Sequence, residues 1–101
     1  MARHAVLTGA NLTGADLRMA YLAYAILQGV NFSNADLTGA DLYAKNLTYA
    51  NFSNANLTNA NLTYANLFGA ILTGATLTGA NFTQARCPNG GTHVAWIQVG
   101  C

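Results

Sequence analysis

Side chains that could perform chemistry are few in this chain, and their spacing predicts no catalytic centre. Those able to act as acids or bases near neutral pH are Asp16, Asp36, Asp41, His4 and His93. No repeated position places a nucleophile beside a base, and the glycine patterns that cradle phosphates or dinucleotides are absent. The sequence therefore predicts a protein that is not an enzyme and that uses no cofactor.

The two cysteines, Cys87 and Cys101, leave two alternatives open. A disulfide between them would close a loop of about 14 residues and stabilise the fold by about 3 kcal/mol in the chain-entropy model. As reduced thiols, Cys87 would be a small core residue and Cys101 would belong to a frayed end. A zinc site that adds His93 fits no known ligand spacing and lacks a fourth ligand, so no metal site is predicted.

The dominant feature of the sequence is a five-residue period. Leucine or phenylalanine occupies every fifth position from Leu7 to Phe82, sixteen times without a gap. Alanine stands two residues earlier at fourteen of the sixteen positions. Five residues rotate about 500° on a helix, and an odd period alternates faces on a flat strand, so neither element keeps these side chains on one face. Only a chain that turns a corner in every repeat does so, which predicts a solenoid.

The other positions of the repeat agree with such a corner. Asn or Asp precedes the large apolar residue in eleven repeats, and Ser or Thr follows it in eleven. The next residue is Gly seven times and Asn three times, which favours a backbone with positive φ. Alanine is expected to point inward because the walls of the solenoid leave little room.

The resulting motif, A-[N/D]-[L/F]-[S/T]-[G/N/Y], resembles the pentapeptide-repeat family over residues 5–86. The resemblance implies an all-β fold, a right-handed quadrilateral parallel β-helix of about four coils with four pentads per coil. Residues 87–101 are expected to form a short C-terminal cap, with Trp96 as its lid. The family is abundant in bacteria, and in cyanobacteria especially. Seven Asn-x-Ser/Thr sequons on so small a chain also favour a bacterial origin.

Charge and hydropathy restrict the partners of such a rod. The net charge is +1 with only seven charged side chains, which argues against binding to nucleic acid. No apolar run approaches the roughly 20 residues that span a bilayer, so no membrane partner is predicted. No signal peptide precedes Ala5, and the cytoplasm is the expected location. The periplasm or the thylakoid lumen is expected instead if Cys87 and Cys101 form a disulfide.

A structural or protein-interaction module of unspecified role is the leading functional hypothesis. Two alternatives remain. Relatives in the resembling family imitate DNA and modulate type II topoisomerases, but their strongly negative surface is lacking here. Ice binding could use the aligned threonines Thr38, Thr58 and Thr78, although Arg18 interrupts their file.

The expected contact surface for an unknown protein partner is an aromatic patch. Stacking the sequence at twenty residues per coil places four of the five tyrosines on one wall or its corner. The residues of this predicted patch are Met19, Tyr21, Tyr24, Tyr43 and Tyr64. Exposed tyrosine and methionine are typical of protein recognition sites. The competing interpretation is that these rings only pack over the coil corners.

The same stacking makes predictions about the core and its one irregularity. Phe32 and Phe52 should stack, and aligned asparagine amides should hydrogen-bond along the rod axis. Lys45 occupies an inward alanine position. The chain could bulge at 43–46, the lysine stem could thread out between coils, or the amine could be functional.

The first coil is expected to lack a cap. Its apolar floor consists of Leu7, Leu12, Leu17 and Leu22. Because water disfavours such a surface, either two copies meet through this end or the chain continues from a neighbouring polypeptide, and we expect a homodimer or end-to-end association. Dimerisation through the Trp96 segment is the alternative.

Overall fold

A computed structural model describes residues 5–22, 25–89 and 92–93, and all structural statements below concern this part of the chain. It contains two short strands, β1 (Ala85–Arg86) and β2 (Thr92–His93). They pair antiparallel, with Ala85 opposite His93 and Arg86 opposite Thr92. The remaining backbone pairing is a series of isolated parallel bridges.

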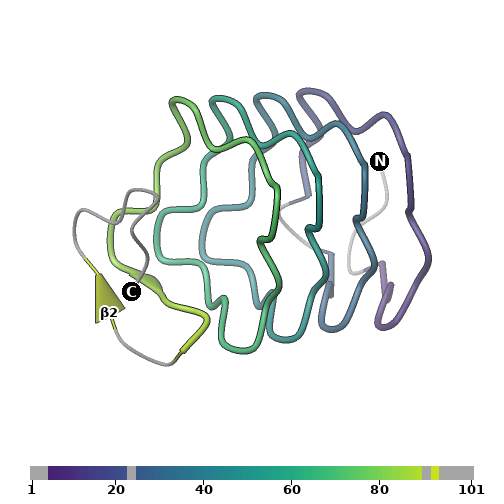
Figure 1. Cartoon of the computed structure of the whole chain (residues 1–101). Coiled ribbons are helices and arrows are strands. Elements are labelled where there is room, and N and C mark those ends of the chain that lie inside the picture. The colour runs from purple at the N-terminus through teal and green to yellow at the C-terminus, as the bar shows by residue number, and fades with distance from the viewer. Residues whose placement is uncertain (1–4, 23–24, 90–91, 94–101) are drawn as a thin grey trace.

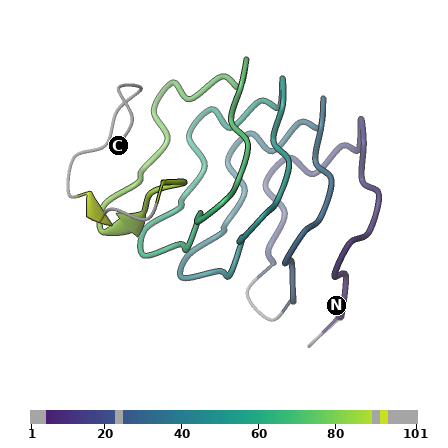
Figure 2. The same ribbon diagram turned by 60° about the horizontal axis from the view of Figure 1, so that its bottom comes forward.

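These bridges stack the chain into coils of twenty residues. Each bridge joins positions twenty apart, as in Asn11–Asn31 followed by Asn31–Asn51. A two-residue turn follows the leucine or phenylalanine of each described pentad, so a coil has four turns and four sides. Figures 1 and 2 show the coils lying side by side from the N-terminal to the C-terminal end. The predicted period of four pentads per coil is confirmed.

The all-β prediction needs a correction in its detail. A corner arrives every five residues, so each side offers only one residue that can complete a bridge to the next coil. The coils are therefore joined by ladders of single bridges instead of extended strands. For orientation we number the sides in chain order. The segments that form them, each with its second residue directed into the core, are 6–8, 26–28, 46–48, 66–68 and 86–88 on the first side, 11–13, 31–33, 51–53 and 71–73 on the second, 16–18, 36–38, 56–58 and 76–78 on the third, and 21–22, 41–43, 61–63 and 81–83 on the fourth.

The core is filled by the repeated leucine and phenylalanine side chains and framed by alanine. In the middle coils these residues are fully buried, including Leu37, Leu57 and Ala55. The rings of Phe32 and Phe52 stack with centroids 4.9 Å apart and planes 8° from parallel, as predicted. Alanine at the other inward position leaves room for these side chains, although the fully buried Val30 shows that a larger apolar residue also fits there.

Asparagine and aspartate stabilise the turn of their own pentad. The Oδ1 of Asn61 accepts hydrogen bonds from the Thr63 N–H at 3.1 Å and from the Thr63 hydroxyl at 2.6 Å. The same pair of contacts recurs in other pentads, for example between Asn51 and Ser53. The sequence predicts hydrogen bonds between stacked asparagine amides along the rod axis. In the described residues, the asparagine Oδ1 atoms instead accept hydrogen bonds from the residue two positions later in the chain. This local turn explains why Asn or Asp and Ser or Thr flank the core residue.

The corner residues confirm the predicted backbone conformation. Every described corner has positive φ, between 67° and 74° at seven glycines and between 55° and 62° at eight other residues. The non-glycine corners are Met19, Asn34, Ala44, Tyr49, Asn54, Asn59, Tyr64 and Gln84. The repeat therefore imposes the left-handed conformation even on side chains that rarely adopt it.

Lys45 lies beside an irregularity in the coils, and of the three alternatives for this residue the bulge is not observed. The regular turn continues through 43–46, and the Lys45 side chain is half-buried. Its carbonyl accepts the Asn66 N–H of the following coil at 2.9 Å. Toward the preceding coil, the bridge between Ile26 and Asn46 is absent among the described residues: neither the Leu27 N–H to Asn46 carbonyl bond nor the Asn46 N–H to Ala25 carbonyl bond is present. The absent bridge thus lies directly beside the position at which lysine replaces the alanine of the repeat.

The first coil covers its core less completely than the second. Its half-buried leucines are Leu7, Leu12, Leu17 and Leu22. Their counterparts one coil later, all fully or nearly fully buried, are Leu27, Phe32, Leu37 and Leu42. The Asn31 N–H donates to the Ala10 carbonyl, whereas no described backbone group accepts the equivalent N–H of Asn11. The same holds for Val6, Asp16 and Tyr21, so this end combines apolar surface with unpaired backbone donors.

At the other end, Cys87 is fully buried and is not a free thiol. The Pro88 carbonyl still accepts the Gly69 N–H at 2.8 Å, so the ladder extends to this point. Cys101 and Trp96 lie outside the described residues. The Cys87–Cys101 bridge and the Trp96 lid of a cap over 87–101 therefore remain predictions.

Candidate interaction surface

Four of the five residues predicted to form the aromatic patch are described, and all four are exposed. We use the name tyrosine patch for Met19, Tyr21, Tyr43 and Tyr64. Their exposed fractions are 74%, 55%, 50% and 55% in that order. Tyr24, the fifth predicted member, lies outside the described residues.

Neighbouring coils bring two of these rings into contact. Tyr43 and Tyr64 meet edge to face, with centroids 5.8 Å apart and planes inclined at 73°. The Tyr43 N–H is held by the Asp41 carboxylate at 3.1 Å, and the Tyr64 N–H donates to the Thr83 carbonyl at 2.9 Å. The rings are therefore displayed from a hydrogen-bonded backbone. Both retain about half of their surface for a partner.

Met19 lies along its corner toward the next coil. A Cβ added to Gly39 would collide with the Met19 sulfur. Glycine at position 39 thus leaves room for the methionine side chain of the preceding coil. A flexible thioether beside tyrosine rings is a combination that adapts to different partner surfaces.

A second aromatic group lies on and beside the first side, and the sequence analysis did not identify it. We call Tyr49, Phe68 and Arg86 the Phe68 cluster. Tyr49 and Phe68 meet edge to face at 5.8 Å and 81°, and the Arg86 guanidinium carbon lies 5.6 Å from the Phe68 ring centroid. The twenty-residue register stacks position 49 on 69 and position 66 on 86, so it places these residues near one another without predicting the contacts that Tyr49 and Arg86 make with Phe68.

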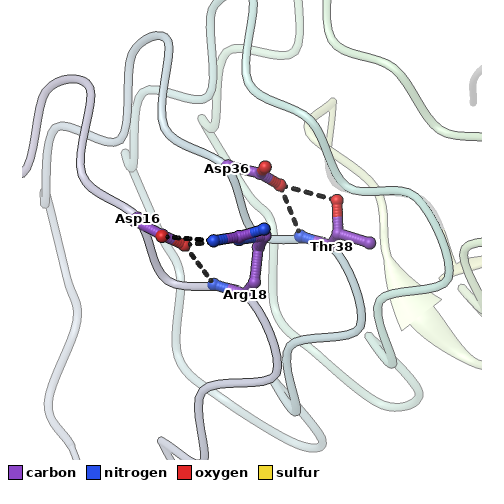
Figure 3. A network of polar contacts seen from close by, with 4 residues as sticks. All are labelled: Asp16, Arg18, Asp36 and Thr38. Atoms are coloured by element: carbon purple, nitrogen blue, oxygen red, sulfur yellow. Dashed lines mark hydrogen bonds and ion pairs between the residues drawn. The ribbon is translucent and has the colours of Figure 1, made fainter.

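The third side carries a polar network instead of aromatic rings (Figure 3). The Arg18 guanidinium forms a two-point contact with the Asp16 carboxylate, with both distances 2.8 Å. These hydrogen bonds lower the pKa of Asp16 to about 2. One coil further, the Thr38 hydroxyl donates to the Asp36 carboxylate at 2.6 Å and lowers the pKa of that group too.

An open depression near this network is lined by Asp16, Arg18, Met19 and Thr38. Both partners of the ion pair are mostly exposed, with side-chain exposed fractions of 62% for Arg18 and 61% for Asp16. Water screens such a pair, and its charges are already satisfied by each other. The network therefore orders the surface of the third side, and the Arg18 cation offsets the repulsion between the stacked carboxylates of Asp16 and Asp36.

Two further properties bear on the candidate site. Among residues 5–22, 25–89 and 92–93, no three His, Cys, Asp or Glu side chains converge as metal ligands would. The described part of the chain also has no helix of the length and apolarity needed to traverse a bilayer.

Comparison with known proteins identifies the family of this repeat. A family model for pentapeptide repeats matches residues 2–20, 15–44, 35–74 and 46–84, with eight copies. Among solved structures, the pentapeptide repeat protein Rfr23 of the cyanobacterium Cyanothece 51142 is 49% identical with a TM-score of 0.74. That match covers 77% of this chain and 53% of Rfr23, so the chain spans about half the length of this relative. No curated protein matches the chain.

Two more distant structures are also similar in sequence. A pentapeptide repeat protein from the thylakoid lumen of Arabidopsis thaliana is 30% identical over 82% of this chain and 65% of its own, with a TM-score of 0.48. QnrB1, a plasmid-mediated fluoroquinolone resistance protein, is 26% identical over 84% of this chain and 45% of its own, with a TM-score of 0.43. The unbroken five-residue repeat, the twenty-residue bridges and the matching family model lead to one conclusion: the chain belongs to the pentapeptide repeat family.

Proposed function

We propose that this chain is a non-enzymatic protein-interaction module that holds a partner against its tyrosine patch. The single observation that carries the proposal is the exposed contact between Tyr43 and Tyr64. The rings come from successive coils whose backbones are hydrogen-bonded to each other. Rigid aromatic side chains supply contact area at a low entropic cost, which is why tyrosine is enriched at interfaces.

The competing interpretation, in which the rings only cover the corners, makes a different prediction. A ring that serves packing alone should become buried against the rod. Tyr43 and Tyr64 instead keep about half of their surface exposed.

We also infer a right-handed winding of the coils, as the family resemblance implies.

The test is capture of a partner with matched variants. Beads carrying the chain, the Tyr43→Ser/Tyr64→Ser variant, and a Thr58→Ala control on the third side would be incubated with extract of the source organism. We expect proteins retained by the first and third beads to be lost from the second, with circular dichroism unchanged. Equal recovery of the same proteins on all three beads would leave the rings with a packing role only.

The two alternative functions receive less support. DNA mimicry requires a dense negative surface, but this chain has three aspartates, and one of them is neutralised by Arg18. An ice-binding face requires hydroxyls directed at water. The hydroxyls of Thr38 and Thr58 instead donate to the carboxylate or amide oxygen two residues earlier. Absence of thermal hysteresis and of any effect on DNA supercoiling would exclude both.

The location of the protein is tied to its cysteines. We propose that Cys87 and Cys101 are bridged, which favours an oxidising compartment such as a periplasm or thylakoid lumen over the cytoplasm. The fully buried position of Cys87 supports protection of a bridge from reductants. Alkylation without prior reduction should then add no mass to the purified protein. Labelling of two thiols would return the expectation to the cytoplasm.

A further inference from the structure

The Phe68 cluster offers a contact surface of a different chemistry from the tyrosine patch. Tyr49 is 64% exposed and Phe68 is 38% exposed. Arg86 is exposed as well, and its guanidinium lies over the Phe68 ring at 5.6 Å. The cluster thus presents two apolar rings and one cation within a single area of surface.

Among the described residues of the first side, the charged side chain is that of Arg86. The two outward rows of the first side are Val6, Ile26, Asn46, Asn66 and Arg86, and Thr8, Gln28, Thr48, Phe68 and Pro88. Neither row contains an acidic residue. The ion pair recorded in the described part of the chain joins Arg18 to Asp16, on the third side. No described carboxylate neutralises Arg86.

A guanidinium that lies over an aromatic ring keeps N–H groups that can donate to another acceptor. These groups match the two oxygens of a carboxylate, and the stacking reduces the freedom that binding would otherwise remove. The exposed parts of the Tyr49 and Phe68 rings remain available for an apolar side chain next to that carboxylate. Arginine and aromatic residues together are also the residue types that dominate binding energy at interfaces.

The backbone beneath the cluster is fixed on both sides. The Tyr49 N–H donates to the Phe68 carbonyl at 2.9 Å, and the Gly69 N–H donates to the Pro88 carbonyl at 2.8 Å. Arg86 belongs to β1, its carbonyl accepts the Leu67 N–H at 3.0 Å, and its position pairs with β2. Little ordering is therefore needed when a ligand binds.

We propose that the Phe68 cluster binds an acidic segment of a protein partner, in which a Glu or Asp carboxylate stands beside an aromatic or aliphatic side chain. The carboxylate contacts Arg86, and the neighbouring apolar group contacts Tyr49 and Phe68. This inference rests on the proposed function, because it specifies the chemical character of the protein partner proposed there. It uses other residues, so it can fail independently of the tyrosine patch.

Amide chemical shifts of the full chain, labelled with ¹⁵N, provide the test. The probe is a ten-residue peptide of alternating Glu and Tyr, compared with its counterpart in which Gln replaces every Glu. We expect the acidic peptide to shift the amides of Tyr49, Phe68 and Arg86 and to bind about three- to fivefold more weakly to Arg86→Gln. The matched control is Arg18→Gln, which should not change the affinity because Arg18 is already engaged by Asp16.

Three results would overturn the inference. One is equal affinity for the Gln peptide, which would mean that no carboxylate is recognised. Another is the absence of any shift at millimolar peptide. The third is a set of shifts confined to Tyr21, Tyr43 and Tyr64, which would remove the role of the Phe68 cluster while still supporting the tyrosine patch.

Discussion

At the scale of single residues, the corner glycines differ in the atoms that an added Cβ would meet. Gly29 and Gly69 occupy the same corner two coils apart, with φ of 67° and 74°. A Cβ at Gly29 would meet only Gly9 backbone atoms at 3.9 Å or more, an ordinary contact. A Cβ at Gly69 would approach the Tyr49 ring to 2.5 Å, so the ring must move.

We therefore expect Gly29→Ala and Gly69→Ala to destabilise unequally. Positive φ costs each variant about 1 kcal/mol of unfolding free energy. Gly69→Ala should lose about 0.5–1.5 kcal/mol more, because displacing Tyr49 breaks its contact with Phe68. Urea unfolding would measure both values. In a Tyr49→Ala background the difference should disappear, and its persistence there would refute the explanation.

The ion pair on the third side gives a prediction about pH. Hydrogen bonds from Arg18 lower the pKa of Asp16 to about 2 from 3.8. A lowered carboxyl pKa stabilises the fold above pH 3.8, and that contribution is lost as the pH falls through about 2. The Arg18→Gln variant should return the Asp16 pKa toward its ordinary value, as followed by carboxyl NMR.

Asp36 is the internal control for that titration. Its pKa is lowered mainly by the Thr38 hydroxyl and only secondarily by Arg18. It should therefore move little in Arg18→Gln and much more in Thr38→Ala. Equal movement of both aspartates in Arg18→Gln would contradict this assignment of causes.

At the scale of the coil, Lys45 marks the place where two coils are joined least well. Lys45→Ala should leave the unfolding free energy unchanged or raise it, because alanine fits this position in fourteen other pentads. The hydrogen bond from the Asn46 N–H to the Ala25 carbonyl should then form, slowing hydrogen exchange of the Asn46 amide. A loss of more than about 1 kcal/mol would show that the lysine makes a needed interaction.

The coil is also where prediction from sequence succeeded best. The five-residue period, read at twenty residues per coil, placed Phe32 on Phe52 and gave the corner residues positive φ. These features depend only on which side chains pack in the core and on which residues can adopt the positive φ of the corner. The contact of Arg86 with Phe68 was missed because it depends on how exposed side chains lean across coils. The break at Ile26–Asn46 was missed because the path of the lysine stem is not encoded in the repeat.

At the scale of the whole molecule, the first coil differs from the interior. Half-buried leucines and unpaired N–H groups occur together there, and the N–H groups are those of Val6, Asn11, Asp16 and Tyr21. We expect concentration-dependent self-association that covers this surface, because another backbone edge can satisfy these donors. Sedimentation should detect it, and hydrogen exchange at the four amides should slow as concentration rises. A monomer at all concentrations, with fast exchange at these amides, would exclude it.

The core of this fold repeats every five residues, whereas its surface columns repeat every twenty. This difference has a consequence for how such a sequence can diverge. Inserting one complete pentad would keep every leucine inside, since the core requires only the period of five. Every outward residue beyond the insertion would advance by one side, a quarter turn around the rod. If the pentad were inserted between Tyr49 and Phe68, both Phe68 and Arg86 would move to the next side, and Tyr49 would keep its original one. Lengthening by five residues thus reshuffles the surface while conserving the interior, and only steps of twenty preserve both.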